Sequence, residues 1–169
     1  MIIGLAGLHG AGKSTIAALL HDLFGWKIVD KMSFLHSLYE NSGSGLSWEE
    51  WRGEKYRKEG AYKIMGLVLG MVQSPTEILV IDSVHNRAEW LAIRETDPNA
   101  LLIGVFAPAT LRKKRKGLIT EADKRRTDYW HETGCLLACI EWTITGTGST
   151  RLQSSECRAL ARYLKTRAG

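Results

Sequence analysis

The eight residues at 7–14, GLHGAGKS, constrain the fold of this chain more than any other part of its sequence. They fit the pattern GxxxxGK[ST]. They lie between an apolar segment at 2–6, which predicts a buried strand, and a segment at 13–24 whose apolar spacing predicts a helix. A glycine-rich turn between a strand and a helix directs several backbone N–H groups, and the positive end of the helix, toward one anion. The sequence therefore predicts a phosphate-binding loop.

The residue types in this loop suit the triphosphate of ATP with Mg²⁺. Glycine allows the tight curl that turns N–H groups inward, Lys13 supplies a compact cation for the β and γ oxygens, and the Ser14 hydroxyl suits Mg²⁺. His9 is expected to be a spacer within the loop. We expect the nucleotide to be bound by Gly7, His9, Gly10, Ala11, Gly12, Lys13, Ser14 and Thr15.

Short apolar runs alternate with segments of helical periodicity along the rest of the chain. Strands are expected at 26–30, 78–82, 101–107 and 141–145. Helices are expected over most of 31–73 and at 87–94, 109–116, 121–139 and beyond 150. Strands that are nearly all apolar and alternate with helices favour a parallel sheet covered on both faces. The expected fold class is α/β, in a single domain of 169 residues.

Local signals refine the helix boundaries. Gly25 is expected to end the first helix, and Ser47 and Glu50 have the spacing of a capping box at the start of a later one. That later helix is expected to be interrupted at one or more of Gly60, Gly66 and Gly70. The last helix is expected to bury a stripe formed by Leu152, Leu160 and Leu164.

The composition is ordinary for a globular protein, with 44% hydrophobic and 24% charged residues. No apolar run approaches the roughly 20 residues of a membrane span, and the first residues lack the basic start of a signal peptide. The three cysteines form no zinc pattern, and this favours a reducing, cytoplasmic setting. The net charge of +5 suits phosphorylated ligands or nucleic acid, and basic residues concentrate at 112–126.

Two classes of nucleotide-binding protein fit the sequence poorly. A GTPase of this length is expected to carry a guanine-reading NKxD segment, and the sequence has none. Motor-type ATPases usually end the third strand with Asp-Glu, where the glutamate activates water, but here Ser83 follows Asp82. Kinases need no such glutamate, because an oxygen of the acceptor attacks the phosphorus. The sequence therefore favours phosphoryl transfer to an acceptor molecule.

Several segments, taken in order, resemble one family. These are GLHGAGKS, ILVID with Glu-Trp seven residues after its aspartate, a basic segment after the fourth strand, and WTITGTGS before the last helix. Together they resemble the small P-loop kinases of the adenylate kinase and dephospho-coenzyme A kinase group, especially archaeal adenylate-kinase-related proteins and phage-type deoxynucleoside monophosphate kinases. The resemblance implies a five-stranded parallel sheet of order 2-3-1-4-5, an acceptor-binding region at 31–73 and a lid at 109–127. It also implies that the loop at 146–149, including Gly148, touches the adenine.

The sequence departs from this family on the acceptor side. His36 stands near the position where such kinases often carry an arginine that grips the acceptor phosphate. The Asp-Gly-x-Arg that often follows the third strand is replaced by Asp-Ser-Val-His at 82–85, and Arg87 lies two residues further on. Asp30 is followed by Met32 rather than by the second aspartate of the dephospho-coenzyme A kinases. The donor side therefore matches, while the acceptor stays unassigned.

The remaining candidate site residues each have a structural alternative. Asp82 is expected to hold Mg²⁺ together with Ser14, or else to cap the helix after it. Asp30 is a candidate base for an acceptor hydroxyl, or a plain turn residue. Trp48 and Trp51 are candidates for stacking on a base, although a core role is more common. Lid arginines are expected to neutralise the transferring phosphoryl group, with a solvated basic helix as the alternative: Arg112, Arg115, Arg125 and Arg126.

These patterns lead to one leading hypothesis and two rivals. The leading hypothesis is an ATP-dependent phosphotransferase that acts on a small molecule, most simply a nucleoside monophosphate or a related nucleotide. The first rival is a nucleic-acid-associated protein that uses the basic stretch at 109–126, although aromatic residues interleave poorly there. The second rival is a non-catalytic ATP-binding switch. The sequence leaves both a monomer and a homodimer open.

Overall fold

A five-stranded parallel sheet forms the centre of the molecule, in a computed structural model that describes residues 1–71, 77–116 and 136–167. The strand order is β2-β3-β1-β4-β5, as the family resemblance implies. The strands are β1 (Ile2–Ala6), β2 (Lys27–Asp30), β3 (Leu79–Val84), β4 (Leu101–Phe106) and β5 (Trp142–Thr145). β1 is buried along its whole length because it pairs with β3 on one side and with β4 on the other.

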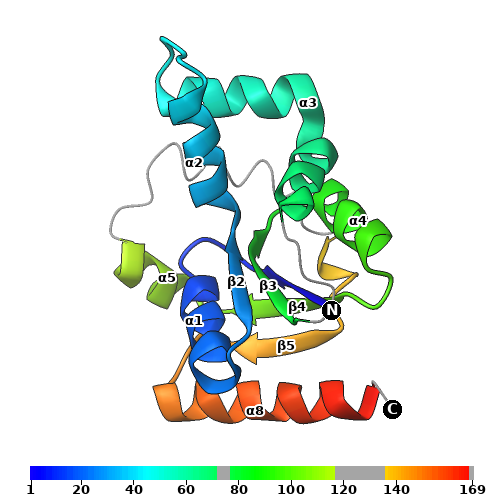
Figure 1. The fold of residues 1–169 in the computed structure, drawn as a ribbon. Helices are drawn as coiled ribbons and strands as arrows, with labels where there is room; N and C mark the ends of the chain where they lie inside the picture. Colours follow the sequence, from blue (N-terminus) through cyan, green and yellow to red (C-terminus); the bar gives the residue numbers. More distant parts are fainter. Residues whose placement is uncertain (72–76, 117–135, 168–169) are drawn as a thin grey trace.

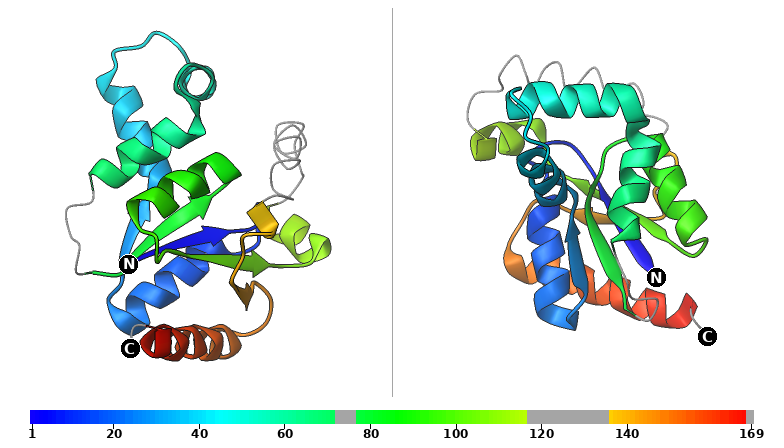
Figure 2. Two further views of the ribbon diagram at one scale, coloured as in Figure 1. Left: turned by 90° about the vertical axis from the view of Figure 1, so that its right-hand side faces the viewer. Right: turned by 45° about the horizontal axis from the view of Figure 1, so that its top comes forward.

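Helices cover both faces of this sheet, as nearly all-apolar strands require (Figure 2). One face packs against α1 (Lys13–Phe24) and α8 (Thr150–Arg167), and this core includes Ile16, Leu20 and Leu160. The other face packs against the later part of α3 (Trp48–Gly70) and against α4 (Arg87–Thr96). Gly25 ends α1 with a φ of 70°, as its sequence position predicts.

The helices α2 (Lys31–Asn41) and α3 rise beyond the sheet, and α5 (Ala109–Lys116) lies apart from them near α1 (Figure 1). The capping box predicted at Ser47 and Glu50 is present at the start of α3. Gly60 breaks this helix with a φ of 77° and a ψ of 153°, a conformation open essentially to glycine alone. Gly66 stays helical, so one of the three expected interruptions accounts for the bend. No helix in the described ranges is long and apolar enough to cross a membrane.

Two expectations need correction. Asp82 does not end its strand, because β3 continues to Val84. The register shifts here, so that Leu5 pairs with Asp82 and Ala6 with Val84, and the extra residue extends β3. In α8, Leu152 is 47% exposed while Leu160 and Leu164 are buried, so the buried stripe begins later than expected. Of the helix expected at 121–139, only residues 136–139 are described.

Candidate functional site

The phosphate-loop sequence forms a tight turn between β1 and α1. Gly7, Gly10 and Gly12 have φ values of 149°, 78° and 104°, a region that side chains rarely adopt. At Gly7 space also forbids a side chain, because a Cβ atom would lie 2.3 Å from the carbonyl oxygen of Val105. Ala11 is buried, whereas His9 is exposed, in keeping with a spacer role. The glycines expected from the sequence are thus the residues that the backbone requires.

The start of α1 has no side-chain cap. Gly12 occupies the N-cap position without a capping hydrogen bond, and Ile16 N–H donates to the Gly12 carbonyl at 3.0 Å as the first bond of the helix. The N–H groups of Ser14 and Thr15 precede this bond, where a helix offers no intrahelical acceptor. Both residues are exposed. The helix therefore presents donors and its positive dipole end to the mouth of the loop, an arrangement suited to a phosphate.

The Lys13 side chain extends toward the start of the phosphate loop. Its Nζ atom donates to the carbonyl oxygen of Gly7 at 2.8 Å and to that of Leu8 at 3.4 Å. The side chain thus reaches from the first turn of α1 to the start of the loop. It places a positive charge beside the backbone of the loop.

Asp30, the last residue of β2, forms a register pair with Asp82, which lies two residues before the end of β3. Val80 belongs to the core beneath α1 and α8, and side chains two residues apart share a face, so the half-buried Asp82 lies on the α1 face. Asp30 caps α2: its carboxylate accepts from Met32 N at 2.9 Å, Ser33 N at 3.1 Å and Ser33 Oγ at 2.6 Å. The pair brings two carboxylates to the edge of the sheet that carries the loop.

Mg²⁺ suits the donor set that this edge supplies. The ion is commonly held in proteins by one or two side chains, with phosphate oxygens and water completing its shell. Ser14 and Asp82 supply a hydroxyl and a carboxylate on the α1 side, and this fits such a partial set. Within the described residues no group of three or more His, Cys, Asp or Glu side chains is placed to hold a metal.

Arg115 connects α5 to the phosphate loop. Its guanidinium donates to the carbonyl oxygens of Gly10 at 3.1 Å, Ala11 at 3.3 Å and Gly146 at 2.6 Å. Arg112 Nε instead donates to the Ala107 carbonyl at 3.2 Å, at the base of the same helix. Of the expected lid arginines, Arg115 thus lies at the loop. Arg125 and Arg126, with the rest of the lid from 117 to 127, lie outside the described residues.

The loop at 146–149 packs directly on the phosphate loop. A Cβ atom on Gly146 would lie 1.8 Å from the Ala11 carbonyl oxygen, so glycine allows this contact. Gly148 has a φ of 96° and completes the turn into α8. Two α8 side chains hold the loop at Thr145: Glu156 accepts its N–H at 3.0 Å, and Gln153 donates to its carbonyl at 3.3 Å. The sequence analysis places Gly146 in the loop expected to touch the adenine, but it misses the contact of Gly146 with the phosphate loop and both of these α8 residues.

The candidate base-stacking tryptophans lie near the start of α3. The rings of Trp48 and Trp51 stack with centroids 5.9 Å apart. His36 and Tyr39 from α2 complete the cluster, with the His36 ring 5.0 Å from that of Trp48. These contacts hold the tips of α2 and α3 together. The side chains of Arg52, Lys55 and Lys58 make ion pairs with glutamates of α3. Lys58 is exposed, whereas Arg52 and Lys55 are half-buried over the rings of Trp48 and Trp51.

This sheet order, with a glycine-rich loop between β1 and α1, defines the P-loop NTPase fold, and solved structures share it. A shikimate kinase from Acinetobacter baumannii, in complex with shikimate, is 18% identical over 99% of this chain and 95% of that chain, with a TM-score of 0.62. One from Aquifex aeolicus is 17% identical over 99% and 98%, with a TM-score of 0.64. A gluconokinase from Sinorhizobium meliloti is 13% identical over 99% and 97%, with a TM-score of 0.59.

No protein-family model matches the sequence, and a search of curated proteins finds no match. At these identities the structural neighbours establish the fold. They share it with the adenylate kinase group that the sequence resembles, but they do not single out that group.

Proposed function

We propose that this protein is an ATP-dependent phosphotransferase that acts on a small molecule. The uncapped start of α1 carries the proposal. Its N–H groups, the glycine curl at 7–12 and the Lys13 ammonium converge where a triphosphate fits. The kinase activity in the names of proteins that share the fold, shikimate kinase and gluconokinase, supports it. The setting that we propose is the cytoplasm.

The donor side divides into three roles. The loop and Lys13 bind the β and γ phosphates, and the loop at 146–149, with Gly148, contacts the base. Ser14 and Asp82 hold Mg²⁺ directly or through water, and the ion supplies charge neutralisation for the phosphate oxygens. Arg115, released from the carbonyl oxygens that it contacts, supplies positive charge to the transferring group, together with Arg112 and Arg126.

The reaction is an in-line displacement at the γ-phosphorus. An acceptor oxygen forms the new P–O bond, the bond from the γ-phosphorus to the bridging oxygen breaks, and ADP leaves with that electron pair. Where the acceptor oxygen is a hydroxyl, its proton passes to a carboxylate, for which we propose Asp30; an ionised phosphate oxygen attacks without losing a proton. The position of Asp30 beside Asp82 at the edge of the sheet supports this role. Among the described residues, Asp30 Oδ2 accepts one hydrogen bond, from Ser33 Oγ, so this oxygen keeps a lone pair for the acceptor.

The acceptor that we propose is a nucleoside monophosphate or related nucleotide, bound within 31–73 and covered by the lid at 109–127. The ordered resemblance of the sequence to nucleotide kinases supports this choice. The competing acceptor class is a hydroxyl-bearing small molecule. The shikimate in one structural neighbour, and the activity named for the gluconokinase, favour that class.

The deciding experiment measures ATP consumption with a panel of acceptors. The panel contains nucleosides, nucleoside monophosphates, dephospho-coenzyme A, shikimate, gluconate and short oligonucleotides, with Lys13→Ala as the inactive control. Stimulation by a small molecule is expected. Tight ATP binding without turnover on any acceptor would contradict the proposal and support the switch.

One observation favours nucleic acid as a second candidate. Lys113 and Lys114 are exposed on α5, where a phosphate backbone can reach them. The neighbouring Arg115 points to the phosphate loop instead, and this supports the kinase. Oligonucleotide binding that falls steeply with salt and is lost in a Lys113→Ala/Lys114→Ala variant would support the second candidate.

A further inference from the structure

A fully buried ion pair lies on the acceptor side of the sheet. The Lys31 ammonium contacts Glu89 Oε1 at 2.7 Å, and both side chains are 0% exposed. Burying two charges costs desolvation free energy that their mutual attraction often fails to repay, so such a pair is weak evidence for a purely stabilising role. The contacts of Glu89 indicate a different one.

The Glu89 carboxylate, carried by α4, accepts hydrogen bonds from three other segments of the chain. Its Oε1 atom accepts hydrogen bonds from Lys31 Nζ at the start of α2 and from Tyr56 OH in α3, the latter at 3.2 Å. Its Oε2 atom accepts the N–H of His85, between β3 and α4, at 2.7 Å. Glu89 itself is fixed on α4, because its N–H donates to the capping side chain of Asn86 at 2.9 Å.

Two of these contacts lie at the strand ends that carry the candidate reacting carboxylates. Lys31 directly follows Asp30, and His85 lies three residues after Asp82. Asp30 and Asp82 are register partners in neighbouring strands. One carboxylate therefore ties the ends of β2 and β3 to the same point on α4, and its third contact adds α3 to that point.

We propose that Glu89 is a positioning residue that sets the separation and orientation of Asp30 and Asp82 for phosphoryl transfer. The proposal rests on the proposed function, because the separation of those two carboxylates affects turnover only if phosphoryl transfer from ATP takes place at this site. The side-chain contacts of Glu89 in the described part of the chain run to the acceptor side. Loss of the network therefore lowers kcat while the binding of ATP by the phosphate loop is retained.

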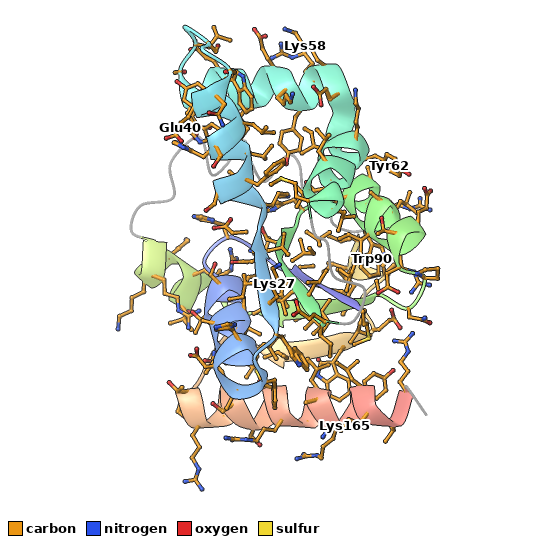
Figure 3. The ribbon with its side chains drawn as sticks, viewed as in Figure 1. Lys27, Glu40, Lys58, Tyr62, Trp90 and Lys165 are labelled. Atoms are coloured by element: carbon orange, nitrogen blue, oxygen red, sulfur yellow. The ribbon has the colours of Figure 1, made fainter. Side chains whose placement is uncertain are left out.

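The variants separate positioning from folding. Glu89→Gln keeps the size of the side chain and one oxygen that can accept hydrogen bonds, but it removes the negative charge. Lys31→Met/Glu89→Gln removes both charges, so that no lone buried ammonium is left. The matched control is Glu95→Gln: Glu95 lies on the same helix and also accepts from an α3 tyrosine, Tyr62 (labelled in Figure 3), but it is exposed. Circular dichroism checks that each variant folds.

Two readouts are measured on the full chain. The first is kcat and the KM for ATP, with the best acceptor of the panel or with water alone. The second is hydrogen exchange at residues 28–33 and 82–87. A folded variant that lacks the Glu89 charge is expected to lose about tenfold or more in kcat with KM within twofold. It is also expected to exchange faster at both strand ends, whereas Glu95→Gln changes neither readout.

Three outcomes would overturn the proposal. They are an unchanged kcat in a folded variant, a KM for ATP that rises in parallel with the loss of kcat, and loss of folding in both variants, which would make the pair a stability element. A wild-type protein without any ATP turnover would refute the proposed function instead. Hydrogen exchange then tests the role of Glu89 by itself. Faster exchange at both strand ends in the Glu89 variants supports the proposal that Glu89 holds these ends in place, and unchanged exchange overturns it.

Discussion

The helix that follows the phosphate loop and the helices α2, α3 and α4 differ in how their N-termini are capped. α1 begins at Gly12 without a side-chain cap. The side chains of Asp30, Ser47 and Asn86 instead cap α2, α3 and α4. Each helix start has N–H groups that need hydrogen-bond partners. Capping side chains satisfy these groups at α2, α3 and α4, while the start of α1 leaves them for a ligand. The uncapped start of α1 is therefore suited to an anion.

The largest expected effect is on the phosphate-loop side. Lys13→Ala is expected to abolish ATP-dependent turnover and to weaken ATP binding while the fold survives, because the ammonium lies along the loop rather than in a core. Calorimetry with ATP and turnover assays check this. Lys27→Ala, an exposed lysine on the edge strand β2 (Figure 3), is the control and should behave as wild type. An unchanged ATP affinity in Lys13→Ala would falsify the assignment of the loop.

Arg115 tests whether the loop and the lid act together. Arg115→Ala is expected to lower kcat by on the order of 10²-fold while ATP affinity changes much less, as for a charge that matters mainly in the transition state. Lys114→Ala, exposed on the same helix, is the control. If Arg112, Arg115, Arg125 and Arg126 all tolerate alanine with near-normal kcat, the basic stretch is not a catalytic lid, and polyanion binding becomes the better explanation.

Asp82 tests the metal assignment. Asp82→Asn is expected to reduce turnover by well over tenfold and to raise the Mg²⁺ concentration needed for half-maximal rate, because a neutral amide positions the ion less well. Rate against Mg²⁺ concentration is the measurement, and Asp22→Asn, on the exposed side of α1, is the control. A variant with wild-type rate and Mg²⁺ dependence would leave Asp82 with a structural role.

On the acceptor side the expected effects are on stability. Gly60→Ala is expected to cost about 1–3 kcal/mol, because a φ of 77° with a ψ of 153° strains any side chain. Gly66→Ala, in the helical part of the same α3 with open space around its Cβ position, is expected to stabilise by about 0.5–1 kcal/mol. Urea unfolding of the two variants checks the opposite signs. Equal effects would show that α3 is not held bent at Gly60 in solution.

The smallest effect is expected at the capping box of α3. Ser47→Ala is expected to lower the Tm by about 2–4 °C, the usual loss for a helix cap in a chain of this size. The hydrogen bonds from Ser47 lower the pKa of Glu50, so this contribution is present above the ordinary glutamate pKa and fades as the pH falls through the lowered one. Thermal scans at pH 7 and at pH 3 should therefore show a smaller difference at the lower pH.

The phosphate loop and its flanking strand and helix were predictable from sequence because they are made of consecutive residues. The strand at 2–6 and the helix at 13–24 are confirmed with their bounds, and the glycine positions follow from backbone conformations that glycine favours. The alternation of apolar strands with helices predicted the parallel sheet, and the family resemblance implied its strand order; the structure confirms both. Each of these inferences depends on local pattern or on chain order alone.

The acceptor side was not predictable in the same way. Asn86 and Glu89 have the spacing of a helix start, but nothing local indicates that Glu89 meets Lys31, 58 residues away. The extension of β3 past Asp82 depends on a register shift against β1 that only the assembled sheet shows. The acceptor region and the lid, at 31–73 and 109–127, remain proposals, and so do the roles of their residues.

The position of β1 in the sheet has a consequence for biosynthesis. This strand is translated before its partners, yet it lies in the middle of the sheet and pairs with β3 from residue 79 and with β4 from residue 101. At the usual 5–20 residues per second, β1 and the phosphate loop after it wait roughly 5–20 s for both neighbours. During that interval a fully apolar strand has no partner, so the nascent chain is most exposed to aggregation, or to chaperone capture, before residue 106 has left the ribosome.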